Sequence, residues 1–188
     1  MRIDREHELR ALRETQVASE DIFEGKILHV KKDTVALPNG EQAYREIIRH
    51  IGAVCVIPVT EDGQVIVERQ YRYPIDRVIT EIPAGKLDSR DEDRLSAIQR
   101  ELREETGYTA EEWISLGDFH PAPAYSDEYI SMYMARKLHR GERHLDEDEF
   151  LDVMRVPLSE LAEDVMAGRI SDAKTQTAVL KAARLLGI

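Results

Sequence analysis

The segment from Gly85 to Tyr108, GKLDSRDEDRLSAIQRELREETGY, constrains the fold most, because it predicts a single helix with two distinct faces. Leu95, Ile98 and Leu102 are spaced by three and four residues, so they form an apolar stripe that can pack on a core. Gly107 comes directly after the acidic residues and Thr106, and glycine commonly ends a helix at such a position. We therefore expect a helix from about residue 93 to residue 106, packed by one face against a sheet.

The other face of this helix carries Glu101, Glu104 and Glu105, whose spacings place all three carboxylates together. Like charges this close repel one another, so helix stability does not explain the cluster. One interpretation is a solvated acidic face paired with Arg100 and Arg103. The other is a site for a hard divalent cation, because Mg²⁺ and Mn²⁺ accept ligand sets made only of oxygen.

The residues around the helix resemble the signature of the Nudix hydrolases, which cleave nucleoside diphosphates linked to another group. The matching positions are Gly85, Glu92, Arg100-Glu101-Leu102, Glu104-Glu105 and Gly107-Tyr108. The second half of the signature matches at every fixed position. In the first half, six residues separate Gly85 from Glu92 where the family has five, and a register that keeps five uses Asp91 instead. The extra residue falls in the loop before the helix, where it is readily accommodated.

Further segments are similar to the ADP-ribose pyrophosphatase branch of this family. They are Glu68-Arg69-Gln70-Tyr71-Arg72-Tyr73, Glu81-Ile82-Pro83-Ala84-Gly85-Lys86-Leu87, Pro121-Ala122-Pro123-Ala124-Tyr125-Ser126-Asp127-Glu128, Asp146-Glu147-Asp148-Glu149-Phe150 and Asp172-Ala173-Lys174-Thr175. An N-terminal stretch of about 45 residues ahead of the signature also fits that branch. The resemblance therefore covers most of the chain.

Strand-like and helical segments alternate along the chain, which predicts an α/β or α+β fold with a mixed sheet and helices on its faces. The expected strands are 27–37 and 42–50, joined at Pro38-Asn39-Gly40, then 53–58, 64–71, 78–82, 113–119, 129–135 and 151–156. The expected later helices are 158–167 and 173–186. The resemblance implies a Nudix αβα sandwich at residues 48–188, preceded by a small β-rich domain at residues 1–47.

The resemblance implies a metal site on the predicted helix. Ala84 would contribute its carbonyl oxygen, with Glu101 and Glu105 as the main carboxylate ligands. Glu104 would join as a ligand and catalytic group when more than one metal is bound. The acidic run before the last strand would supply the general base and a further ligand, with Glu147 as base and Glu149 as ligand, or the two exchanged.

Substrate contacts are expected from several elements. Arg72 is the best candidate for a phosphate clamp, because a guanidinium group can bind phosphate oxygens through two hydrogen bonds. By resemblance, Arg45 and Glu46 lie near the adenosine end, often from a second subunit. Glu81 would meet the terminal ribose, and the loop containing Ala124 would line the pocket.

Composition narrows the class of protein. The net charge of −11 argues against non-specific binding to nucleic acid or anionic membranes, so local arginines and metal must hold an anionic substrate. No run of about 18 apolar residues is present, so no membrane span is expected. The one cysteine, Cys55, lies in an apolar run and is expected to be a buried small residue, with a cytoplasmic location as the default.

The resemblance therefore implies a Mg²⁺-dependent hydrolase, with Mn²⁺ as a possible substitute, that cleaves ADP-ribose to AMP and ribose 5-phosphate as a homodimer. The alternatives are a pyrophosphatase for another nucleotide sugar or dinucleotide, and a non-catalytic nucleotide-sensing Nudix domain. The intact acids and the lack of a basic module argue against the sensing domain.

Overall fold

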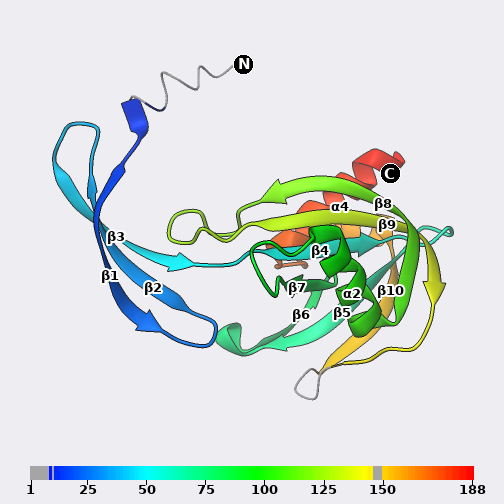
Figure 1. The fold of residues 1–188 in the computed structure, drawn as a ribbon. Coiled ribbons are helices and arrows are strands. Elements are labelled where there is room, and N and C mark those ends of the chain that lie inside the picture. The colour runs from blue at the N-terminus through cyan, green and yellow to red at the C-terminus, as the bar shows by residue number, and fades with distance from the viewer. Residues whose placement is uncertain (1–8, 10, 146–149) are drawn as a thin grey trace. The chain divides into compact units, whose positions relative to one another are not determined.

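The computed structural model describes residues 9, 11–145 and 150–188, and these form two compact units (Figure 1). The first unit contains the chain up to His50 together with Ala122–Glu128. The second contains Ile51–Pro121 and Tyr129–Ile188.

The first unit is built on a three-stranded antiparallel sheet in the order β1-β2-β3. Its strands are β1 (Thr15–Glu24), β2 (His29–Ala36) and β3 (Gln42–Arg49). The predicted hairpin is confirmed, and Gly40 in its turn has φ of 86°, which suits a residue without a Cβ atom. We did not expect β1, all of whose residues are exposed.

The second unit contains two sheets, with strand orders β10-β5-β6 and β7-β4-β9-β8. The strands are β4 (Ala53–Pro58), β5 (Gln64–Arg72), β6 (Arg77–Glu81), β7 (Ala84–Lys86), β8 (Tyr108–Phe119), β9 (Ile130–Arg140) and β10 (Leu151–Pro157). A short 3₁₀ turn, η1 (Tyr73–Ile75), joins β5 to β6. Strands β4 and β9 are parallel and the other pairs are antiparallel, so the predicted mixed sheet is confirmed.

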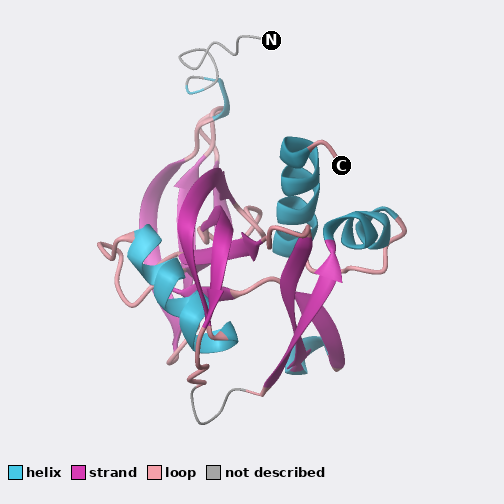
Figure 2. Ribbon diagram, turned by 90° about the vertical axis from the view of Figure 1, so that its right-hand side faces the viewer, coloured by secondary structure: helices cyan, strands magenta, loops and turns pink. Residues whose placement is uncertain are grey.

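Three helices cover the sheets of this unit: α2 (Arg94–Thr106), α3 (Leu158–Met166) and α4 (Ala173–Leu186). Strand β4 is buried on both faces. Its residues Val54 and Val56 pack in the same core as α2, whereas Cys55 and Ile57 share a second core with α3 and α4. The helices therefore lie on opposite sides of β4 (Figure 2), as in a sandwich of helix, sheet and helix.

The thiol of Cys55 is fully buried, as predicted, and burial raises its pKa to about 12. A thiol with so high a pKa stays protonated at neutral pH and is a poor nucleophile. Cys55 therefore serves as a small apolar residue.

Helix α2 forms where the acidic segment predicted it. Its N-cap is Asp93, whose side chain accepts a hydrogen bond from the Ser96 amide at 2.8 Å, and it ends at Gly107 with φ of 76°. Ile98 and Leu102 of the apolar stripe are fully buried. Among the described residues, no helix has both the length and the apolar character that a membrane span requires.

Candidate active site

The backbone just before α2 is fixed by the sheet. Ala84 pairs with Cys55 of β4, and the amide of Val56 donates to the Pro83 carbonyl at 3.0 Å. This pairing holds β7 beside β4, and α2 packs against both strands. The acidic face of α2 consequently meets the peptide units at Ala84 and Gly85.

Two carboxylates of α2 lie against those peptide units. Glu105 is buried and accepts a hydrogen bond from the Ala84 amide at 3.1 Å. Glu101 occupies the space beside Gly85: a Cβ atom added to this glycine would lie 2.1 Å from the carboxyl carbon of Glu101. Glycine at position 85 is therefore what allows the Glu101 carboxylate to approach the chain this closely.

The guanidinium group of Arg100 contacts four carboxylates on α2 and in the loop before it. Its guanidinium donates to Glu101 at 2.8 Å and to Glu104 at 3.3 Å, and it also reaches Glu92 at 3.4 Å and Asp88 at 3.7 Å. Burial lowers the pKa of Arg100, but the nearby carboxylates outweigh this and raise it overall. The charge repulsion anticipated from the sequence is thus partly offset by one arginine.

Glu92 also accepts a hydrogen bond from the Asp88 amide at 2.6 Å. Its carboxylate therefore connects the loop before α2 to Arg100.

The donors around Ala84 and Gly85 are chemically suited to a hard divalent cation, since they are carboxylate and backbone oxygens. The place beside Gly85 that a side chain would fill is taken by the Glu101 carboxylate, so oxygen atoms are concentrated at this point. Within the described residues, however, no three carboxylate, histidine or cysteine side chains converge as ligands of one ion. Arg100 and the Ala84 amide hold the acids instead. A cation here would take Glu101 from Arg100 and complete its coordination with backbone oxygen, water and substrate.

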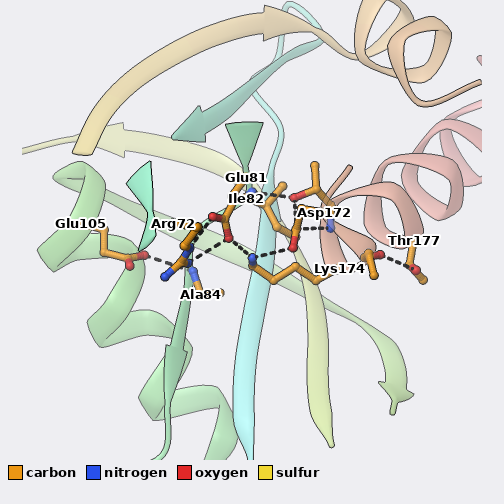
Figure 3. A network of polar contacts seen from close by, with 10 residues as sticks. Arg72, Glu81, Ile82, Ala84, Glu105, Asp172, Lys174 and Thr177 are labelled. Atoms are coloured by element: carbon orange, nitrogen blue, oxygen red, sulfur yellow. Dashed lines mark hydrogen bonds and ion pairs between the residues drawn. The ribbon is translucent and has the colours of Figure 1, made fainter. Parts of the chain in front are cut away.

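Arg72, at the end of β5, is held by a buried carboxylate (Figure 3). Its Nε and one terminal nitrogen donate to the two oxygens of Glu81 at 2.6 and 2.9 Å. Lys174 of α4 also contacts Glu81. Burial by itself would raise the pKa of Glu81, but Arg72 and Lys174 more than compensate and lower it. The Arg72 side chain remains 44% exposed, so its guanidinium is accessible to a ligand.

The predicted site residues fall into three groups. The first group lies in the second unit: β7 and α2 carry Ala84, Glu101, Glu104 and Glu105, and β5 and β6 carry Arg72 and Glu81. The pKa of Arg72 is raised mainly by its hydrogen bonds to Glu81, and the charge of Glu105 adds a smaller contribution. The second group lies in the first unit and consists of Arg45, Glu46 and Ala124. Arg45 forms an ion pair with Glu14, whereas the other two residues are exposed. Glu147 and Glu149 lie outside the described residues.

Sequence reasoning missed the role of Lys174. Its partner Glu81 is 93 residues away, so no local pattern could connect them. The only available signal was the segment Asp172-Ala173-Lys174-Thr175, which matched the family without an assigned role.

The chain is similar to known proteins over most of its length. A NUDIX domain model matches residues 49–175, and a model of the nucleoside diphosphate sugar hydrolase N-terminal domain matches residues 14–48. A protein of Bacillus subtilis strain 168 named "ADP-ribose pyrophosphatase" is 42% identical, over 91% of this chain and 93% of the relative. A Bacillus methanolicus protein named "Methanol dehydrogenase activator" is also 42% identical, over 88% and 90% of the two chains.

The fold is also similar to a solved structure described as an ADP compounds hydrolase. The TM-score is 0.83 at 24% identity, and the match covers 93% of this chain and 95% of the other. At that identity the likeness concerns the fold alone. Because the NUDIX domain match spans more than half of the sequence and includes β7, α2 and the acids between them, this chain belongs to the Nudix hydrolase family.

Proposed function

We propose that this enzyme hydrolyses the pyrophosphate bond of ADP-ribose to give AMP and ribose 5-phosphate. The observation that carries the proposal is the pair of carboxylates, Glu101 and Glu105, that lie against the backbone of Ala84 and Gly85. The choice of substrate is supported by the relative named for this activity, which is 42% identical over most of both chains.

Nudix hydrolases require a divalent metal ion, and we propose Mg²⁺ here, with Mn²⁺ able to replace it. Glu101, Glu105 and the Ala84 carbonyl would hold the ion, and Glu104 and Glu149 would contribute further oxygens. When bound, such an ion neutralises phosphate charge and lowers the pKa of coordinated water.

The chain's own residues would then bind and orient the substrate. Arg72 would hold a phosphate oxygen through its accessible guanidinium, which keeps its positive charge while it contacts Glu81. Arg100 would keep Glu101 and Glu104 on the same side of α2. Glu147 would accept a proton from water as the water oxygen forms a bond to one phosphorus atom. The bond from that phosphorus to the bridging oxygen would break, so that the bridging oxygen leaves with the other product.

We further propose that residues 1–47 form a dimerisation domain that also contributes Arg45 and Glu46 as substrate contacts. Its described residues include exposed large apolar side chains on β1, on β3 and in the connection between β1 and β2, namely Val17, Ile22, Phe23, Tyr44, Ile27 and Leu28. A contiguous patch of exposed apolar side chains is typical of a surface that associates with a partner, and we propose that these side chains contribute to such a patch. A second copy of the chain would cover them, and Ala124 would line the same substrate pocket as Arg45.

The proposal is tested by release of phosphate from ADP-ribose in an assay coupled to a phosphatase. The reaction contains Mg²⁺, and EDTA provides the control for metal dependence. GDP-mannose, NADH and diadenosine polyphosphates are measured in parallel at the same concentration. We expect metal-dependent turnover with the highest kcat/KM for ADP-ribose.

The other outcomes separate the alternatives. A higher kcat/KM for another compound would keep the hydrolytic chemistry and overturn the assignment of ADP-ribose. Binding of these compounds without any cleavage would instead identify a nucleotide-sensing domain.

A further inference from the structure

Lys174 is a partly buried cation that the hydrolytic chemistry does not itself need. Its side chain is 11% exposed, at the N-terminus of α4, and its ammonium group contacts Glu81 and lies 3.0 Å from Asp172. Burying an ammonium group is costly unless it is paired, so both carboxylates matter to its position. The pairing places Lys174 one contact away from Arg72 (Figure 3).

The N-terminus of α4 holds this lysine in a fixed place. Asp172 is the N-cap of α4: its carboxylate accepts from the Thr175 amide at 2.9 Å and from the Thr175 hydroxyl at 2.6 Å. The same hydroxyl oxygen accepts from the Ile82 amide at 2.9 Å. The start of α4 is thus attached both to the residue after Glu81 and, through Lys174, to the Glu81 carboxylate.

Glu81 in turn determines where Arg72 lies. The carboxylate is 4% exposed and receives two hydrogen bonds from the guanidinium in a bidentate arrangement, which fixes the plane of the arginine as well as its position. If Lys174 were absent, Arg72 would be the one described cation in contact with Glu81. More of the arginine's charge would then be engaged by Glu81 and less would be available to a phosphate.

We propose that Lys174 is a positioning residue for the phosphate clamp: by sharing Glu81 with Arg72, it holds the arginine in place and leaves its charge available to the pyrophosphate group of the substrate. The inference rests on the proposed function of Arg72. It assigns to the N-terminus of α4 a part in substrate binding without contact to the substrate.

The test is a comparison of Lys174→Met and Lys174→Arg with the wild type. We expect Lys174→Met to raise KM for ADP-ribose about tenfold, as expected for weakening one hydrogen bond to a charged group, with a smaller effect on kcat. Lys174→Arg, which restores the charge, is expected to recover most of the affinity. Lys181→Met is the matched control, because Lys181 is on the same helix and contacts the Leu116 carbonyl instead.

A double-mutant cycle separates positioning from general stability. In an Arg72→Ala background, Lys174→Met should raise KM no further, because the residue through which it acts is gone. An equal rise in both backgrounds would overturn the inference. An equal rise in Lys181→Met would overturn it too, since any perturbation of α4 would then have the same effect.

Binding of inorganic pyrophosphate, measured calorimetrically in EDTA, keeps this test independent of the substrate assignment. The wild type and Lys174→Arg should bind more tightly than Lys174→Met and Arg72→Ala, even if ADP-ribose is not hydrolysed. Equal affinity of the wild type and Arg72→Ala would show that Arg72 is not the clamp, and the inference would fall. If Lys174→Met does not fold, Lys174→Gln takes its place in the same comparison.

Discussion

At the residue scale, the candidate site depends on a glycine, whose lack of a side chain leaves space for a neighbouring carboxylate. Gly85 leaves room for the Glu101 carboxylate, and the Ala84 amide next to it donates to Glu105. The positions of these acids along the helix could be predicted, because spacings of three and four residues define a helical face. Their contacts with Ala84 and Gly85 could be expected only from the family resemblance, because they depend on how β7 packs against α2.

Replacing Glu101 or Glu105 by Gln is expected to reduce kcat by more than about 100-fold. Loss of a residue that only supports a metal ligand typically costs up to about 100-fold, and we propose that these two carboxylates bind the metal directly. The amide is isosteric and can still accept a hydrogen bond, so each variant should fold. Steady-state kinetics and circular-dichroism melting are the measurements. Glu160→Gln, on the exposed surface of α3, is the control and should retain activity. Wild-type turnover in either site variant would disprove the metal assignment.

Gly85→Ala is expected to lower activity far more than stability. The new Cβ atom would overlap the end of the Glu101 side chain, which is flexible and can swing away, so the cost to folding is small while the carboxylate leaves its place. Gly63→Ala gives the opposite pattern: φ is 78° and the space around it is open, so strain of about 1 kcal/mol is expected with normal activity. Thermal melts and kcat/KM of both variants provide the comparison, and normal activity in Gly85→Ala would contradict our placement of Glu101.

At the element scale, strongly patterned segments were predictable and exposed ones were not. Strand β4 and helix α4 have the predicted bounds, since both carry continuous apolar faces. Strand β1 was missed because its ten residues are exposed and have no apolar alternation. Strands β8 and β9 extend further than predicted: the additional residues pair with one another, including Glu111 with His139 at 2.8 Å, and such charged pairs have no hydrophobic period.

The N-cap of α2 leads to a prediction about pH. The Ser96 amide donates to Asp93 and lowers the pKa of its carboxyl. A depressed pKa means that the cap stabilises the fold above the unfolded-state pKa of about 3.9, and that this contribution is lost as the pH falls through the lower folded value. Asp93→Ala should therefore lower Tm at pH 7, with the difference from wild type shrinking below about pH 4. Asp93→Asn should show a smaller and pH-independent difference, since asparagine also caps helices. A difference between Asp93→Ala and wild type that is constant from pH 7 to pH 2.5 would contradict this account.

At the scale of the whole molecule, a chain of net charge −11 must bind an anionic substrate through local cations. In the second unit, Arg72 is the cation that we propose contacts the substrate, whereas Lys174 and Arg100 are paired with neighbouring carboxylates and hold them in place. The family and fold class could be predicted because the signature is contiguous in sequence. The pairing of Lys174 with Glu81 could not, since it forms only when α4 packs near β6.

The remaining prediction concerns the oligomeric state and the first unit. The apolar side chains of β1 are exposed, and they would be removed from water only if a partner covered them. Val17 and Ile22 are 54% and 53% exposed, and Val17→Glu with Ile22→Glu should convert a dimer into a monomer, measured by light scattering. Leu185→Glu is the control: Leu185 is 60% exposed but belongs to the second unit, so this variant should remain dimeric. If Arg45 contacts substrate across the dimer, the monomeric variant should also lose affinity for ADP-ribose. A monomer with full activity would exclude a site shared between subunits, whereas a wild type that is already monomeric would exclude β1 as a dimer interface.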